Sequence, residues 1–429
     1  MNNPTHYVGR ANRRRKSLGV LVAGLVLAVA MLAMACGGGE ETTAPAPTPT
    51  PSTPPASDSV KVGVLHSLTG TMAISEIPVR DATLLAIDEI NAAGGVMGKK
   101  IAVTQEDGTS EPSIFAQKAQ KLIQQDKVVT VFGGWTSASR KAMLPVFEAN
   151  KHLLWYPIQF EGNECSPNIM YSGAQPNQQI LPALDWGFQQ QGYKKYYLLG
   201  SDYVFPRTAN LILRKHIENR GGTVAGEDYV PLGHQDFASV INKIKAAKPD
   251  AVYNTINGDS NVAFFKQLAA AGVTVKDLPI VSFSIAEQEA KAMGAQLMAG
   301  SYAAWNYFES VSSPENKKFV EAFKAKFGAG QVLDDPMVHG YIDVYLWKAA
   351  VEKAGTFDPI AVAKAARGLE IMTPMGKVKI DSNQSFYQTV YVGELQSNGQ
   401  FKVLWDSKTP VKPEPYDPLA FPGKTCHWE

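Results

Sequence analysis

From residue 60 onward, segments with strand-like and helix-like hydrophobic patterns follow one another. Val60 to Leu65 alternates apolar and polar positions as a β-strand does, and Ile77 to Ala93 carries apolar residues at helical spacing. Gly94 and Gly95 follow at once, and glycine commonly ends a helix. Because strands and helices continue to alternate, the pattern predicts parallel sheets covered by helices.

The remaining elements fall into two blocks with the same strand–helix order, which predicts an α/β fold of two lobes, each a parallel sheet flanked by helices. We expect the first lobe to hold residues 60–173 and 303–374, and the second 174–302 and 375–429. Further strands are predicted at 100–105, 128–132, 153–157, 195–200, 223–229, 251–255 and 280–282, with a hairpin-like stretch at 376–405. Further helices are predicted at 114–125, 139–149, 178–191, 208–220, 237–247, 261–271, 314–327, 338–354 and 359–368.

The N-terminal region differs from this pattern. Basic residues at 10–16 precede the uncharged run Leu18–Ala35, which is typical of an export signal, so residues 1–35 are predicted to be a signal peptide. Cys36 follows small residues as in a bacterial lipobox, which predicts lipidation of Cys36 and a membrane anchor. The alternative is an uncleaved anchor helix. Residues 36–59 are Pro-rich and are expected to form an extended tether. Both alternatives place the body outside the cytoplasm.

Composition narrows the class of protein. A chain of 429 residues with 45% hydrophobic and 19% charged residues suits two lobes rather than one core. The net charge is +1, but without the basic N-terminal segment the body is mildly acidic, which argues against nucleic-acid binding. The sequence has no Gly-x-Ser-x-Gly, GxxxxGK[ST], GxGxxG or HExxH motif. Its seven histidines lack metal-ligand spacing. We therefore expect no enzyme, metal or cofactor.

The candidate site residues lie in the loops that follow the predicted strands, because ligands in open α/β sheets lie beyond the carboxyl ends of the strands. These loops combine aromatic rings, hydroxyls, amides and a carboxylate, which suits a small uncharged ligand that forms hydrogen bonds. An amino acid ligand would instead call for an arginine or helix N-terminus facing its carboxylate. The candidates are Trp135, Ser137, Tyr156, Gln159, Tyr203, Asp259 and Ser284.

Several candidates have a structural alternative. Trp135 suits an ordinary core position. Tyr203 suits packing beside a turn. Ser137 or Ser139 would cap the helix predicted at 139–149, and Asp259 or Ser260 would cap the helix predicted at 261–271.

Four charged residues nearby are expected to have structural roles. Arg140 and Lys141 are expected to lie on a solvated helix face. Glu161 and Glu164 are three positions apart near Gly162, which indicates a loop rather than an acid–base pair.

Five stretches of the body look like those of a known family: residues 134–142, 156–162, 166–169, 200–210 and 254–260. Through them the body from Val60 resembles the type 1 periplasmic binding proteins of the branched-chain amino acid class. Within that class it is most similar to the urea-binding components of urea ABC transporters and to short-chain amide-binding proteins. The resemblance implies an ABC transporter permease as partner and ligand contacts at Trp135, Ser137, Tyr156, Tyr203 and Asp259.

Urea chemistry agrees with this set. Urea is planar and neutral, with four N–H donors and one carbonyl. Asp259 would accept from its amino groups, Ser137 and Tyr203 would bind its carbonyl, and Trp135 or Tyr156 would stack on its plane. Amide-binding relatives have Tyr and Thr where this chain has Trp135 and Ile158, which favours urea. The alternatives are a short amide or branched-chain amino acid, an amide-responsive intracellular sensor, and an amidase or urease-like hydrolase.

The cysteines add one further prediction. If Cys36 carries the lipid, Cys165 and Cys426 remain in a body outside the cytoplasm, where thiols oxidise. We therefore expect a disulfide between them. The alternative is two unpaired cysteines.

Overall fold

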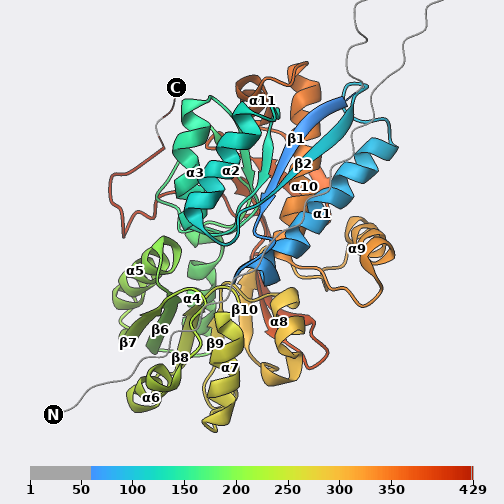
Figure 1. Cartoon of the computed structure of the whole chain (residues 1–429). Coiled ribbons are helices and arrows are strands. Elements are labelled where there is room, and N and C mark those ends of the chain that lie inside the picture. Colours follow the sequence, from blue (N-terminus) through green and yellow to red (C-terminus); the bar gives the residue numbers. More distant parts are fainter. Residues whose placement is uncertain (1–58, 427, 429) are drawn as a thin grey trace, which may run out of the picture. The chain divides into compact units, whose positions relative to one another are not determined.

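The computed structural model describes residues 59–426 and residue 428. Its first sheet has five parallel strands in the order β2-β1-β3-β4-β5. Helix α1 packs against α10, and α2 packs against α3 (Figure 1). We call this unit the first lobe. The strands are β1 (Ser59–His66), β2 (Lys100–Asp107), β3 (Val131–Gly133), β4 (Leu154–Tyr156) and β5 (Ile169–Tyr171). The helices are α1 (Ala73–Ala92), α2 (Pro112–Gln124), α3 (Ser137–Ala149), α9 (Pro314–Phe327), α10 (Asp335–Ala354) and α11 (Pro359–Ala366).

The second lobe is built on a seven-stranded sheet in the order β15-β14-β10-β9-β8-β6-β7. The strands β7, β6, β8, β9 and β10 are parallel, and β14 and β15 complete the sheet antiparallel. The strands are β6 (Lys195–Ser201), β7 (Thr223–Val230), β8 (Ala251–Thr255), β9 (Ile280–Ser282), β10 (Tyr302–Trp305), β14 (Tyr391–Leu395) and β15 (Phe401–Asp406). The helices are α4 (Ile180–Gln190), α5 (Val204–Asn219), α6 (Ala238–Ala247), α7 (Ser260–Ala270) and α8 (Glu287–Met293), with short 3-10 helices at Pro176–Gln178 and Ala295–Leu297.

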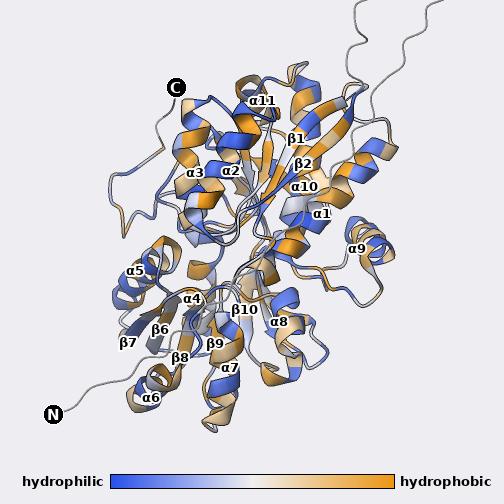
Figure 2. Cartoon of the chain, in the orientation of Figure 1, coloured by the Kyte–Doolittle hydropathy of each residue, from blue (hydrophilic) through white to orange (hydrophobic). Residues whose placement is uncertain are grey.

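Apolar side chains account for this layering. All five residues of β8 are buried, as expected for a parallel strand covered on both faces. One core cluster of the second lobe includes Phe264 and Trp305, and another includes Tyr196 and Tyr253. Colouring by hydropathy shows helices with one apolar and one polar side (Figure 2).

A three-stranded antiparallel sheet corrects the expected lobe boundaries. It consists of β11 (Glu370–Thr373), β12 (Gly376–Ile380) and β13 (Phe386–Tyr387). Val378, Ile380 and Phe386 belong to the hydrophobic core of the first lobe. Conversely, β10 lies in the sheet of the second lobe rather than in the first lobe. The order of elements along the chain predicts the lobe to which each short strand belongs, but the core that each one joins depends on long-range packing.

Asn306 joins the three segments that connect the lobes, which follow β5, β10 and β13. Its Nδ2 donates to the carbonyl oxygens of Gln178, at 3.2 Å, and Thr389, at 3.0 Å. Its backbone N–H donates to Oδ2 of Asp335 at the start of α10, at 2.9 Å. One buried side chain therefore links all three connections.

The C-terminal tail contacts both lobes. Asp417 Oδ2 lies 2.8 Å from Nε2 of His216 on α5, and the backbone N–H of Asn163 donates to the Pro415 carbonyl oxygen. Cys426 is joined by a disulfide to Cys165 of the first lobe, with Cα atoms 5.7 Å apart. The pairing expected from the cysteine count is thus present.

Residues 1–58 lie outside the described part of the chain, and with them the predicted signal peptide, Cys36 and nearly all of the tether. Ser59, expected to end the tether, begins β1. Within residues 59–426, no helix has the length and apolar character needed to cross a membrane.

Candidate ligand-binding site

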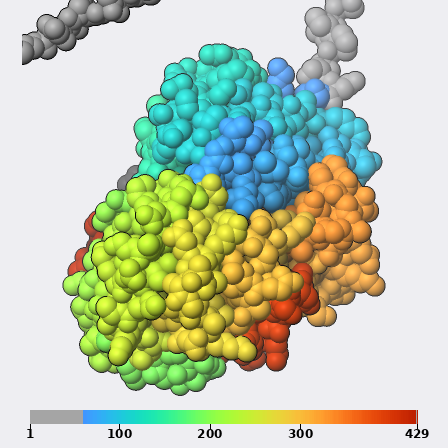
Figure 3. All heavy atoms as spheres, turned by 60° about the horizontal axis from the view of Figure 1, so that its bottom comes forward, coloured from blue at the N-terminus to red at the C-terminus, as the bar shows by residue number. Residues whose placement is uncertain are grey.

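The carboxyl ends of strands from both sheets meet where the lobes touch. Ser75 Oγ on α1 donates to Oε1 of Glu289 on α8 at 2.6 Å. Trp135 Nε1 donates to Oδ1 of Asn257, which follows β8, at 3.3 Å. In the space-filling view the N-terminal segment of the first lobe lies directly against the middle of the chain in the second (Figure 3). The polar side chains at this boundary are therefore held between the lobes.

Gln159, Ser284 and Trp135 lie at this boundary as predicted from their positions after strands. Gln159 Nε2 donates to the Phe283 carbonyl oxygen at 2.9 Å and to Ser284 Oγ at 3.4 Å. Trp135 is buried in the core of the first lobe, so it has the alternative core role together with its contact to the second lobe.

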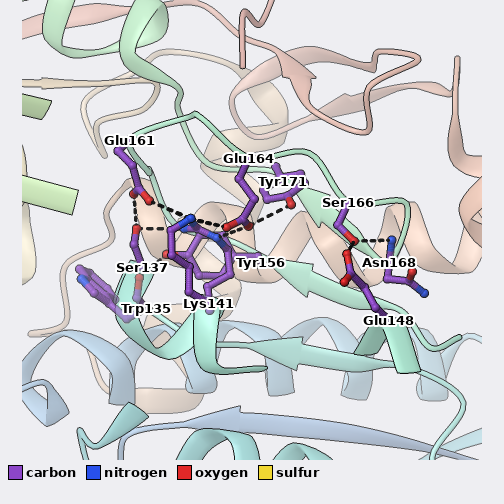
Figure 4. A network of polar contacts seen from close by, with 11 residues as sticks. Trp135, Ser137, Lys141, Glu148, Tyr156, Glu161, Glu164, Ser166, Asn168 and Tyr171 are labelled. Atoms are coloured by element: carbon purple, nitrogen blue, oxygen red, sulfur yellow. Dashed lines mark hydrogen bonds and ion pairs between the residues drawn. The ribbon is translucent and has the colours of Figure 1, made fainter. Parts of the chain in front are cut away.

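Ser137 and Tyr156 belong to a buried ionic network centred on Arg140 (Figure 4). Ser137 Oγ donates to Oε2 of Glu161 and accepts from Arg140 at 2.9 Å. Tyr156 donates its hydroxyl proton to the Trp135 carbonyl oxygen, and its ring centroid lies 5.0 Å from the Arg140 guanidinium carbon. Burial raises the pKa of the Tyr156 hydroxyl, which keeps it a donor.

Arg140 corrects the expectation of a solvated helix face. Its side chain is fully buried, donates from Nε to Glu164 at 2.8 Å and donates from a terminal nitrogen to Glu161 at 3.1 Å. Lys141 is partly exposed and lies 2.7 Å from Glu164. Burial raises the pKa of Glu164, but Arg140 and Lys141 lower it further, to about 2. The helical pattern could not indicate these partners, because they come from a loop that folds back more than 20 residues later.

The expected caps also differ from the structure. Thr136, rather than Ser137 or Ser139, caps α3 by accepting a hydrogen bond from the Ser139 backbone N–H at 3.0 Å. Asp259 occupies the position before α7, but its side chain forms no cap and instead accepts from the Thr71 hydroxyl of the first lobe. The backbone at Asp259 is already helical, so its carboxylate is free to turn toward the other lobe.

Tyr203 precedes α5 and lies half-buried, with its ring centroid 6.4 Å from that of Phe205. Burial raises the pKa of the Tyr203 hydroxyl, and nearby Tyr156 and Glu161 of the first lobe raise it further. Its hydroxyl is therefore near the Arg140 network from the opposite lobe.

Several buried oxygens at this boundary have no hydrogen-bond partner among the described residues. They include Gln159 Oε1 and Glu76 Oε1. Glu76 is not among the predicted residues, because it lies in the first turn of α1, ten positions beyond the end of β1. The strand-end rule points to the loop that leads into this turn. Within the described part of the chain, no cluster of three or more His, Cys, Asp or Glu residues could hold a metal ion.

The comparisons with known proteins agree with this architecture. The Leu/Ile/Val-binding protein BraC3 of Rhizobium johnstonii is 26% identical and is matched over 76% of this chain and 88% of its own. A leucine-, isoleucine-, valine-, threonine- and alanine-binding protein of Pseudomonas aeruginosa is also 26% identical, over 78% and 90%. A solute-binding protein of an ABC transporter from Rhodopseudomonas palustris, solved with 3,4-dihydroxybenzoic acid, is similar with a TM-score of 0.73 and 26% identity, over 83% and 98%. A model of the periplasmic binding protein domain matches residues 60–420, and the chain belongs to that family.

Proposed function

We propose that this protein captures urea outside the cytoplasm and delivers it to an ABC importer. The observation that carries the proposal is that buried Arg140 is largely used by its own acidic partners. Four of its five N–H groups donate to Glu161, Glu164 and Ser137. Arg140 therefore keeps one N–H at most and cannot form a bidentate pair with a ligand carboxylate.

Charge at the boundary supports a ligand without a carboxylate. Glu161 and Glu164 offset Arg140 and Lys141, while Glu76 and Asp259 add further acidic groups. A carboxylate ligand would meet repulsion there, whereas a neutral ligand would not. Leucine and dihydroxybenzoate both carry a carboxylate.

The unpartnered acceptors support a ligand rich in N–H donors. Gln159 Oε1 and Glu76 Oε1 are buried without donors, and a buried acceptor that stays unsatisfied costs on the order of 1–3 kcal/mol. Urea is small and nevertheless offers four N–H donors. The aromatic rings of Trp135, Tyr156 and Tyr203 suit its flat faces.

A branched-chain amino acid is the second candidate, because two relatives are named for binding such ligands. An ammonium group would also satisfy the unpartnered acceptors. Arg140 argues against this candidate, since four of its five N–H groups are already used and the α-carboxylate would lack a bidentate cationic partner.

We further propose that a lipid on Cys36 holds the protein at the membrane and that the Pro-rich segment 36–59 spaces the lobes from it. Membership of the periplasmic binding protein family supports a location outside the cytoplasm. An ABC transporter permease would be the partner that receives the ligand.

Calorimetric titration of the purified protein with urea, acetamide, formamide, leucine and benzoate tests the ligand assignment. We expect binding of urea, weaker binding of the amides and none of benzoate. Binding of leucine with no heat from urea would replace urea by the amino acid.

A further inference from the structure

Glu76 is a fully buried carboxylate in α1 whose role toward the ligand the proposed function leaves open. Its Oε2 accepts from the Ser67 backbone N–H at 2.7 Å and lies 3.3 Å from Nδ1 of His66. Its Oε1 has no partner among the described residues. Oε2 of this carboxylate is thus held in place, and Oε1 is left without a donor.

The neighbours of Glu76 place it at the boundary between the lobes. Ser75, the preceding residue, donates to Glu289 of the second lobe. Thr71, in the loop that leads into α1, donates to Asp259 of the second lobe. The charge of Glu76 is also close enough to Tyr203 of the second lobe to contribute to its raised pKa.

At this boundary Glu76 keeps a fully buried carboxylate oxygen without a donor, unlike Glu161. Both oxygens of Glu161 accept from side chains, and Oδ1 of Asp259 accepts from Thr71. A buried carboxylate oxygen without a donor is unfavourable, so such groups normally find one in protein, water or ligand. Glu76 has its second oxygen available for a bound molecule.

We propose that Glu76 Oε1 receives N–H donors of the ligand and selects amide-like molecules over carboxylates of the same shape. This inference rests on the proposed function and adds its selectivity residue. The Ser67 N–H and His66 hold the carboxylate in place, and the first turn of α1 favours its negative charge. A ligand carboxylate in the same place would put two negative charges in contact, whereas an NH₂ group forms a charge-assisted hydrogen bond.

The test compares Glu76→Gln with Glu89→Gln by calorimetric titration with urea. Glu89 lies on the same helix about 20 Å farther along, and it accepts hydrogen bonds from Tyr341 and Tyr345. Loss of a hydrogen bond to a charged group predicts urea binding about 10- to 100-fold weaker in Glu76→Gln. We expect Glu89→Gln to stay within about twofold of the unmodified protein.

A second measurement separates recognition from a merely structural role. Acetamide and acetate share one shape, so their competition with urea reports on the charge at Glu76. We expect acetate to compete better, relative to acetamide, in Glu76→Gln than in the unmodified protein. A structural role would weaken all ligands alike and lower the melting temperature without ligand. If Glu76→Gln does not fold, Glu76→Asp replaces it. This variant keeps the charge but has a shorter side chain that moves the carboxylate oxygen away from the ligand, so we expect the same weakening of urea binding.

The outcomes keep the two proposals apart. Unchanged urea affinity in Glu76→Gln overturns the role of Glu76 and leaves the urea assignment standing. If the unmodified protein binds leucine instead of urea, the urea assignment fails, and the same variants are titrated with leucine, whose ammonium supplies N–H donors. Tight binding of benzoate or of acetone, which carry no N–H group, contradicts the role of Glu76 directly.

Discussion

The Thr71 hydroxyl of the first lobe donates a hydrogen bond to the Asp259 carboxylate of the second lobe, across 188 positions of sequence. Asp259 N–H also donates to the Thr71 carbonyl oxygen at 3.3 Å. The two residues are therefore bonded twice, and Gly258 beside them has a positive φ of 67°. A Cβ at Gly258 would approach the Thr71 carbonyl oxygen to 2.7 Å, so this contact requires glycine there.

The first prediction asks what this contact contributes to binding. If Asp259 also accepts urea N–H groups, Asp259→Ala is expected to weaken urea binding by about 2–3 kcal/mol, as for charged hydrogen bonds. Thr71→Val removes only the contact between the lobes and is expected to cost about 1 kcal/mol. Calorimetry of both variants and the double variant measures the coupling. Equal losses in the two single variants would show that Asp259 acts through the lobe contact alone.

The second prediction is closure on urea. Binding to the native state alone raises stability by about 2.7 kcal/mol when urea is at 100 times its Kd. We therefore expect a higher melting temperature with urea and a slightly smaller radius of gyration in solution scattering. A melting temperature that responds to leucine but not to millimolar urea would argue against the assignment.

The third prediction concerns acid stability. The pKa of Glu164 in the folded protein is about 2, below its ordinary value of 4.5, because Arg140 and Lys141 outweigh its burial. Ionised Glu164 therefore stabilises the fold above pH 4.5, by about 3 kcal/mol, and this contribution is lost as the pH falls toward 2. Glu164→Gln is expected to be less stable at pH 7 and similar to the unmodified protein near pH 2.

Denaturant unfolding between pH 2 and 7 provides the measurement. The exposed Glu111, immediately before α2, supplies the control Glu111→Gln, which should follow the unmodified protein throughout. Parallel pH profiles for Glu164→Gln and the unmodified protein would mean that the ion pair with Arg140 adds nothing to stability.

The fourth prediction concerns the disulfide between Cys165 and Cys426. Its sequence separation is 261 residues, and the chain-entropy model gives up to about 5 kcal/mol for so long a loop. Cys426→Ser is expected to lower the melting temperature and to free the tail for proteolysis. Thiol titration of the unreduced, unfolded mature protein should find no reactive thiol, whereas two would contradict the bond.

Elements with clear end signals were predictable from sequence, even when short. Helix α9, strand β8 and the three-residue strand β9 have the bounds that their patterns indicate. Strands β5 and β10, of three and four residues, were not predicted, because so short a segment shows no period by itself. Helix α1 begins at Ala73, ahead of the predicted Ile77, and continues through Pro78. Proline inside a helix normally marks its start, so the pattern shortened the helix.

The candidate site shows the same limit. Trp135, Gln159, Asp259 and Ser284 lie at the lobe boundary because strand ends in each sheet meet there, which topology alone implies. The burial of Arg140 follows from charges in a distant loop, which no local pattern encodes. Long-range polar partners were therefore the part that the sequence could not supply.

The disulfide has a topological consequence for resistance to proteolysis. Cys165 and Cys426 close a covalent ring that contains the whole second lobe and all three segments that join it to the first. A protease that cuts the chain once anywhere between these cysteines would open the ring but leave a single molecule. A nick in an interlobe segment would thus not release either half, and the broken chain would retain both faces of the proposed site.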